Sequence, residues 1–311
     1  MVQPSFDIDP LRPRDDAFGA VQLMSSLDQG PGSVRELGSL RSTMRHFVFV
    51  LGRVDGEPVG FGFAGTWPGG EEGPCLEADI GVMPAFRRRG VGSALLRTLS
   101  DHAGALGHTG LQLEVRDDRA DGLDFLLHRG YQQVSRELQF ELDLTDAPPF
   151  SCAPPPGIEI VTRAERPDLV QGMYEVALDA QGDVPESDGE GPGDFEDWHA
   201  FLNARPEHRP ELCFLALNNE EVIGSAMLQV FEGGIAYHGG TLVKRAWRRR
   251  GIATALTSRQ IAAAEASGIR LLRCETEARN EPMRGLLERL GYRPLPSFAV
   301  MRGPLRGEVE S

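Results

Sequence analysis

The sequence is poor in the features that mark disulfide-bonded, metal-binding and membrane proteins. It has four cysteines among 311 residues, Cys75, Cys152, Cys213 and Cys274, and no CxxC pair. Zinc ribbons and dithiol redox sites need such pairs, so we predict reduced thiols and no metal site. No run reaches the roughly 18 apolar residues of a membrane-spanning helix. The start, MVQPSFDIDPLRPRDD, is too charged for a signal peptide, so we expect a cytoplasmic protein with no membrane partner.

Positive charge is also in short supply. There are 32 Lys and Arg residues against 46 Asp and Glu residues, which gives a formal net charge of −14. Nucleic acids are bound by clustered basic surfaces, so this balance argues against a nucleic acid partner, whereas it suits a cationic small molecule. With 41% hydrophobic and 25% charged residues, the composition is that of a globular protein long enough for two domains of about 150 residues.

One stretch of eleven residues occurs twice in the sequence. Residues 86–96 read FRRRGVGSALL, and residues 247–257, 161 positions later, read WRRRGIATALT. The offset holds without a gap from Val82 through Tyr131, which is the signature of an internal repeat. Proline cannot donate a ladder hydrogen bond, so the five prolines of residues 147–157 predict a linker between the copies.

We therefore predict two domains of one kind, residues 1–146 and 158–311. Hydrophobic periodicity gives strands, the arginine stretch, a helix, a strand and a helix in both halves, and in the first half it also gives an opening helix and a final strand. The predicted fold class is α/β, in the mixed α+β sense.

The arginine stretch lies between a predicted strand and a predicted helix. The first N–H groups of a helix have no intrahelical partner and the helix dipole makes that end positive, so an anion is favoured there. Gly90 and Gly251, with Gly92 and Ala253 two residues on, keep large side chains away from the backbone. A single copy could be a solvated basic patch, but two copies in one context indicate a pyrophosphate site.

Both stretches resemble the motif of the GNAT acyltransferase superfamily: Arg or Gln, two residues, Gly, one residue, then Gly or Ala. VMPAFRRRGVG and VKRAWRRRGIA fit it, with Arg87 and Arg248 in the first position. NEPMRGLLERLGY, residues 280–292, is similar to the family's second signature. The resemblance implies two tandem GNAT domains, each a splayed, mixed, mostly antiparallel sheet flanked by helices.

The resemblance also implies acetyl-CoA as co-substrate and direct transfer of its acetyl group to the amine of a small-molecule acceptor. The pyrophosphate would bind at the helix start and the pantetheine arm along the splayed strand. The implied binding residues are Val82, Met83, Pro84, Arg87, Arg88, Arg89, Gly90, Val91, Gly92 and Ser93 in the first half, and Val243, Lys244, Arg245, Arg248, Arg249, Arg250, Gly251, Ile252, Ala253, Thr254 and Asn280 in the second.

Two departures from the family pattern bear on catalysis. In many members a tyrosine protonates the departing thiolate, but Leu126 and Leu287 occupy that position here. The second half keeps Asn280, where the first has Arg119. We therefore expect a catalytic second half and a non-catalytic first half.

Three titratable side chains lie near the middle of the strands that would form the second cleft: Glu275, Tyr237 and His238. An ammonium acceptor must lose a proton before it can attack, so a base is needed. Glu275 and Tyr237 rank ahead, because His238 would face away from the cleft in a regular strand; if a bulge re-aims it, His238 is the expected base. The alternatives are a structural histidine and a solvated carboxylate.

Two questions stay open at the level of sequence. Residues 183–198 hold seven carboxylates and no basic residue, which fits either a solvated loop or an attractor for a cationic acceptor. The tandem layout with a catalytic C-terminal half is that of mycothiol synthases, so the amine of a thiol-cofactor precursor is one candidate acceptor. The alternative to an enzyme is a non-catalytic module that binds acetyl-CoA, and the missing tyrosines favour it.

Overall fold

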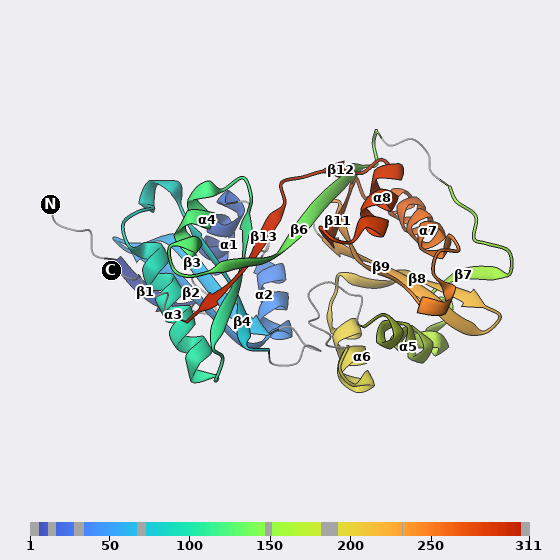
Figure 1. The fold of residues 1–311 in the computed structure, drawn as a ribbon, viewed down its shortest axis with the longest axis horizontal. Coiled ribbons are helices and arrows are strands. Elements are labelled where there is room, and N and C mark those ends of the chain that lie inside the picture. Colours follow the sequence, from blue (N-terminus) through green and yellow to red (C-terminus); the bar gives the residue numbers. More distant parts are fainter. Residues whose placement is uncertain are drawn as a thin grey trace. The chain divides into compact units, whose positions relative to one another are not determined.

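The computed structural model describes residues 6–11, 17–27, 34–66, 73–146, 151–181, 192–231 and 233–305. These residues form two compact units (Figure 1). The first unit consists of the described residues up to 136 together with those from 298 onward, and the second unit consists of residues 137–297.

The first unit is a mixed sheet with helices packed against it. Its strands, in spatial order, are β1 (Phe6–Pro10), β2 (Arg45–Val54), β3 (Glu57–Thr66), β4 (Cys75–Val82), β5 (Gly110–Arg116) and β13 (Phe298–Pro304), and its helices are α1 (Ala17–Ser26), α2 (Val34–Thr43), η1 (Pro84–Phe86), α3 (Val91–Ala105) and α4 (Ala120–Leu127). Neighbouring strands are antiparallel except β4 and β5, which are parallel.

The second unit repeats this arrangement. Its strands, in spatial order, are β6 (Gln132–Asp143), β11 (Leu271–Glu277), β10 (Ile235–Val243), β9 (Glu221–Phe231), β8 (His208–Asn218) and β7 (Ile158–Thr162), with β12 (Arg293–Pro294) beside β6. Its helices are η2 (Pro167–Leu169), α5 (Val170–Ala180), α6 (Phe195–Ala204), η4 (Arg245–Trp247), α7 (Ile252–Ala266) and α8 (Glu281–Arg289). Figure 1 shows α5 and α6 on one side of these strands and α7 and α8 on the other. Among the described helices, none has the length and apolarity needed to cross a membrane.

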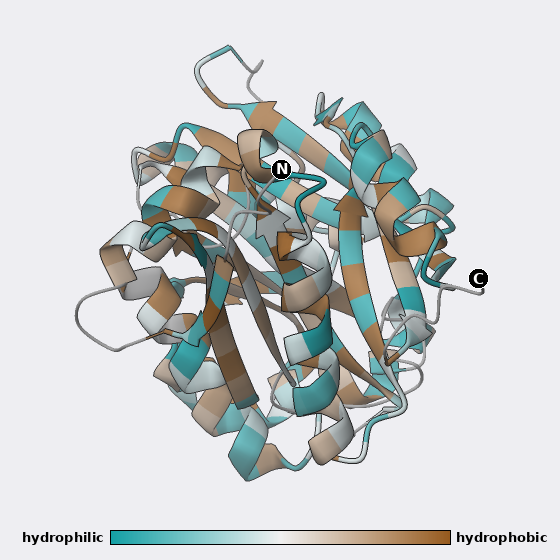
Figure 2. Ribbon diagram, turned by 90° about the vertical axis from the view of Figure 1, so that its left-hand side faces the viewer, coloured by the Kyte–Doolittle hydropathy of each residue, from teal (hydrophilic) through white to brown (hydrophobic). Residues whose placement is uncertain are grey.

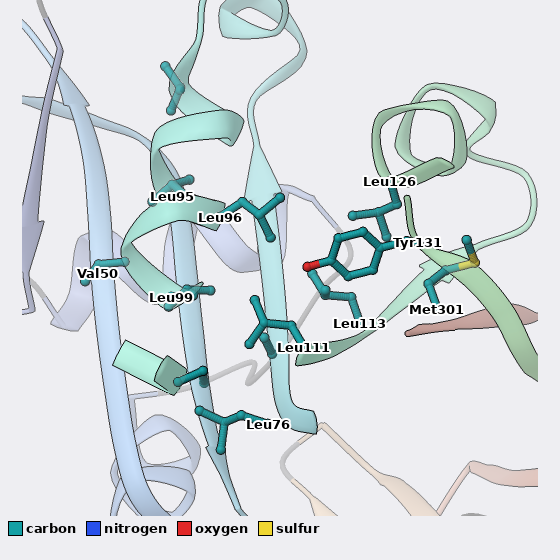
Figure 3. Packing of buried hydrophobic residues seen from close by; sticks show 14 of the residues in the cluster. Val50, Leu76, Leu95, Leu96, Leu99, Leu111, Leu113, Leu126, Tyr131 and Met301 are labelled. Carbon is teal, nitrogen blue, oxygen red and sulfur yellow. The ribbon is translucent and has the colours of Figure 1, made fainter. Parts of the chain in front are cut away.

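The sequence pattern explains how each unit holds together. In α3, Leu95, Leu96 and Leu99 recur at helical spacing and are buried against the sheet (Figure 3). The sheet carries Gly60 and Gly62 below this helix, where an added Cβ would lie 3.2 Å from the side chains of Leu95 and Leu99 respectively. Hydrophobic residues are accordingly concentrated along several strands, while the helices carry bands of hydrophilic residues (Figure 2). The prediction of two tandem mixed units is confirmed.

The last strand of each repeat lies in the other unit. β13, which ends the second repeat, pairs with β5 and places Val300 opposite Glu114. β6, which ends the first repeat, pairs with β11 and places Gln139 opposite Glu275. The pairing of β13 with β5 and the pairing of β6 with β11 have the same register once the 161-residue offset is applied. β13 therefore takes the position in the first unit that β6 takes in the second.

The compact units therefore differ from the predicted domains 1–146 and 158–311. The physical reason is that the repeats are alike, so either terminal strand satisfies the hydrogen-bonding edge of either sheet. In the predicted linker, residues 151–157 form no helix or strand, and residues 147–150 lie outside the described residues.

Gly303 allows β13 to pack in the first unit. Tyr131 is 1% exposed and lies in the core with Leu126 and Met301 (Figure 3). A Cβ at Gly303 would come within 2.3 Å of the Tyr131 ring. The strand can lie on this ring only if that position has no side chain.

Replacing Gly303 with valine should therefore destabilise the protein. Overpacking of this kind costs about 2 kcal/mol, so the midpoint of urea unfolding should fall. Gly38→Ala is the matched control, because nothing lies within 4 Å of a Cβ there and alanine favours the helix. An unchanged midpoint for Gly303→Val would show that β13 does not pack on Tyr131.

Candidate active site

A cleft of about 1310 Å³ opens in the second unit where β10 and β11 separate. The two parallel strands pair over Ile235–Tyr237 and Leu271–Arg273 and then diverge. Beyond the last pair, the walls come from both strands, from η4 and the start of α7, and from the first turns of α8. This is the splayed sheet that the family resemblance implied.

A β-bulge at Gly239 and Gly240 shapes the β10 side of the cleft. His238 and Thr241 are three positions apart on β10, but their partners on β9 are two positions apart, so one residue is inserted. Gly240 has a φ of +116°, which L side chains rarely adopt. In the first unit, β4 pairs with β3 without a register shift. The bulge therefore distinguishes the two units.

The inserted residue turns His238 to the other face of the sheet. Tyr237 lies beside Arg273, as Glu77 lies beside Gln112 in the first unit. Arg273 and Gln112 are 161 positions apart, whereas Tyr237 and Glu77 are 160 positions apart. Before the bulge, from Ile235 to His238, each side chain therefore points opposite to the direction that the 161-residue offset indicates, whereas Thr241 and Val243 after the bulge keep that offset.

His238 lines the cleft, but both its ring nitrogens are hydrogen-bonded. Nδ1 is 3.0 Å from Gln260 Oε1, and Nε2 is 2.6 Å from the Tyr292 hydroxyl. The amide oxygen can only accept, so Nδ1 carries the proton and Nε2 accepts from the tyrosine. Burial lowers the pKa of His238 to about 4, and the ring is neutral at pH 7. This arrangement suits a residue that holds the bulge rather than one that takes a proton.

Glu275 lies in the wall of the cleft, and its side chain is exposed there. Its Oε1 accepts a hydrogen bond of 2.6 Å from Gln139 Nε2 on β6. The surrounding protein displaces water and raises the pKa of Glu275, while the Gln139 hydrogen bond and the charge of Arg273 oppose that rise. A carboxylate with a raised pKa is a stronger base than an ordinary one.

Tyr237, the third predicted catalytic residue, does not line the cleft. Its hydroxyl accepts a hydrogen bond of 3.1 Å from Arg273 Nη1, and its ring lies edge-on to Phe231 at 5.5 Å. Arg273 also donates to Glu141 Oε2 at 2.8 Å. The structure therefore brings Glu275 and His238 to the cleft and leaves Tyr237 beside it.

The start of α7 forms one end of the cleft. Gly251 caps the helix with a φ of +83° and has no side chain to bond the first N–H groups. The first intrahelical bond runs from Ala255 N to Gly251 O, so the N–H groups of Ile252, Ala253 and Thr254 precede the helical ladder. All three residues line the cleft, as do Val243, Arg245, Arg248, Arg249 and Asn280. The predicted anion site is thus assembled in one place.

Two of the predicted binding residues are directed elsewhere. The only lysine of the sequence, Lys244, pairs with Glu221 at 2.8 Å. Arg250 lies with its guanidinium carbon 4.8 Å from the centre of the Trp247 ring. Neither residue lines the cleft. Trp247 belongs to the repeated stretch, whereas Glu221 lies outside it.

Asn280 and Leu287 have structural places on α8. The Asn280 Oδ1 caps the helix by accepting from Met283 N at 3.3 Å. Leu287 is fully buried in the core of the second unit, as Leu126 is in that of the first. No acidic proton is available at either leucine, so the family's tyrosine has no replacement at its own position.

The first unit has the same loop backbone, with φ values of +60° at Arg88 and +90° at Gly90. Arg87 Nε donates to Val82 O at 3.0 Å, as Arg248 Nε donates to Val243 O in the second unit. Of the remaining predicted residues, Met83 and Pro84 lead into η1, Arg89 lies with its guanidinium carbon 5.4 Å from the Phe86 ring centre, and Val91 is buried in the core.

In the first unit, three side chains lie close to the glycine loop that precedes α3. A Cβ at Gly92 would lie 3.5 Å from the Phe125 ring. Arg129 lies with its guanidinium carbon 3.8 Å from the centre of that ring and donates to Ser93 Oγ at 2.8 Å. Arg87 is paired at 2.6 Å with Asp121, where the second repeat has proline. In the first unit, Phe125, Arg129 and Asp121 therefore lie beside the glycine loop.

The acidic segment 183–198 is described in part. Residues 182–191 lie outside the described residues. Asp194 caps α6 by accepting from the backbone N–H groups of Glu196 and Asp197. This aspartate thus has a structural role.

Comparison with known proteins gives a consistent result. The sequence profile of the Acetyltransferase (GNAT) family matches residues 22–131 and 172–292. A mycothiol acetyltransferase of Brachybacterium faecium is 28% identical over 236 residues, which cover 73% of this chain and 67% of the relative.

Two solved structures resemble the whole chain. A GCN5-related N-acetyltransferase from Sphaerobacter thermophilus has a TM-score of 0.78 at 23% identity, over 97% of this chain and 96% of that one. A tandem GNAT protein from the clavulanic acid biosynthesis pathway also has a TM-score of 0.78, at 17% identity, over 98% of this chain and 100% of that one. The matched regions, one in each repeat, span most of the sequence, and the chain therefore belongs to the acetyltransferase (GNAT) family as a tandem member.

Proposed function

We propose that the second unit transfers an acetyl group from acetyl-CoA to the amine of a small-molecule acceptor, and that the first unit does not turn substrate over. The observation that carries this proposal is the cleft between β10 and β11, which has a helix N-terminus at one end and Glu275 in its wall. Acyl transfer from a CoA thioester is the general activity of the family.

The residues at the start of α7 fit the pyrophosphate of acetyl-CoA. The helix dipole and the N–H groups before the ladder favour an anion, and Gly251 leaves the approach to them open. Arg248 and Arg249 add positive charge at the same end of the cleft. Acetyl-CoA would supply the acetyl group as a thioester in the space between the diverging strands.

Glu275 is the proposed acceptor of the amine's proton. An amine reaches the cleft as ammonium near neutral pH and must be deprotonated before it attacks. Glu275 is exposed in the cleft and has a raised pKa, whereas His238 is neutral and bonded at both nitrogens. Because Leu287 replaces the family's tyrosine, we propose that water protonates the departing thiolate, whose reference pKa is ~8.5.

The mycothiol acetyltransferase relative supports one choice of acceptor class. That protein is called a mycothiol acetyltransferase, and its match covers most of this chain. We propose an amine acceptor similar in size and polarity to the acceptor of that relative. The negative charge of Glu275 attracts such an amine while it is still protonated.

A Gly251→Glu variant should lose acetyl-CoA binding. The new carboxylate would stand at the helix start, where it repels a pyrophosphate, and affinity measured by calorimetry should fall by at least about 30-fold. Gly90→Glu is the matched control in the first unit and should change affinity less than about two-fold. If Gly90→Glu removes acetyl-CoA binding and a folded Gly251→Glu variant keeps it, the cofactor site belongs to the first unit and the assignment to the second unit is wrong.

A Glu275→Gln variant should lose activity. General-base catalysis contributes about 100-fold or more, so thiol release with a panel of amines should slow by that factor. In the wild type, the rate should rise with pH as Glu275 loses its proton, and this limb should vanish in the variant. Glu114→Gln at the matched position, and Tyr237→Phe, should stay within about three-fold of wild type.

Two outcomes of this experiment would contradict the proposal. A wild-type rate and pH profile for Glu275→Gln would exclude Glu275 as the base. If the wild-type protein bound acetyl-CoA but none of the amines caused thiol release, the protein would be a binding module.

A further inference from the structure

The wall of the cleft that carries Glu275 is completed by a strand of the first repeat. β6 pairs with β11 from Glu137 to Asp143, within the second unit. Alternate residues of this strand face the same side as Glu275. Gln139 bonds Glu275, Glu141 bonds Arg273, and Glu137 is 6% exposed and lines the cleft.

The strand exchange decides which residue stands opposite Glu275. In the first unit, the equivalent glutamate, Glu114, faces Val300 of β13. Val300 is the residue that Glu275 would face if each repeat kept its own last strand. Valine has no hydrogen-bond donor, whereas the Gln139 amide has two. The exchange therefore gives Glu275 a hydrogen-bond donor, Gln139, in place of the valine that the second repeat carries at this position.

We propose that Gln139 is a positioning residue for Glu275, and that the active site of the second unit is complete only with the strand supplied by the first repeat. The inference rests on the proposed function, in which Glu275 takes the proton of the amine. It gives the non-catalytic repeat a chemical task beyond that of a scaffold.

The hydrogen bond explains how this positioning works. Gln139 Nε2 donates a hydrogen bond of 2.6 Å to Glu275 Oε1. This bond orients the carboxylate, so its second oxygen is held in one place. The bond also stabilises the charged form and opposes the rise in the pKa of Glu275 that the surrounding protein causes by displacing water. Other charged or titratable groups on these strands are Arg273, Cys274 and Glu277 on β11, Glu137 and Glu141 on β6, and Tyr237 and His238 on β10.

Two substitutions with opposite effects test the proposal. Gln139→Met removes the donor at similar volume, so the acid limb of kcat/KM should move to higher pH, and the rate at pH 6 should fall about five-fold relative to that at pH 8.5. Gln139→Lys keeps a donor and adds positive charge, so the same limb should move to lower pH. A merely structural role would lower the rate of both variants at all pH values alike.

The matched control is Gln112→Met in the first unit. Gln112 accepts a cross-strand hydrogen bond of 2.6 Å from Arg302 Nε, so its loss perturbs the sheet in a comparable way without touching Glu275. This variant should keep the wild-type pH profile. Calorimetry with acetyl-CoA, expected to be unchanged within about two-fold for all three variants, shows that each is folded.

The outcomes separate this inference from the function on which it rests. If Glu275→Gln is inactive and both Gln139 variants keep the wild-type profile, or both lose rate uniformly, the role of Gln139 is refuted while that of Glu275 stands. If Glu275→Gln keeps its activity, the proposed base is wrong and the positioning role falls with it.

Discussion

The ladder between β6 and β11 is the interaction on which the second unit depends. β10 pairs with β11 over three residues and then leaves it, so the other side of β11 must be held by β6, which pairs over all seven residues from Leu271 to Glu277. Without β6, the far wall of the cleft would be an edge strand with little support. The same ladder sets Gln139 opposite Glu275. One set of backbone hydrogen bonds thus supports the β11 wall of the cleft and also places Gln139 beside Glu275.

Small local differences separate two repeats that share a fold. One residue inserted at Gly239 and Gly240 turns His238 onto the α7 side, where Gln260 and Tyr292 hold it. In the first unit, β4 has no such bulge, and Tyr131, the counterpart of Tyr292, has a buried hydroxyl without a hydrogen-bond partner among the described residues. Phenylalanine, arginine and aspartate side chains lie beside its glycine loop. Similar backbones therefore carry different side chains around the two loops.

The sequence predicted the parts of this arrangement that depend on local pattern. The repeat, the fold and the strand-to-helix glycine loop follow from periodicity and from the needs of a helix N-terminus, and Gly251 has the predicted place. The exchange of β6 and β13 could not be predicted, because both strands fit both sheets equally. The bulge was an open alternative for His238, and the structure places it at Gly239 and Gly240. Gln260 and Gln139 were missed, since their partners are distant in sequence.

We infer that acetyl-CoA is used in the second unit and not in the first. A crystal structure of the full chain grown with acetyl-CoA would reveal which unit binds it. We expect one molecule between β10 and β11, with its pyrophosphate at the start of α7 and its thioester beside the Gly239–Gly240 bulge. A molecule bound at the start of α3 in the first unit, with the second cleft empty, would overturn the inference.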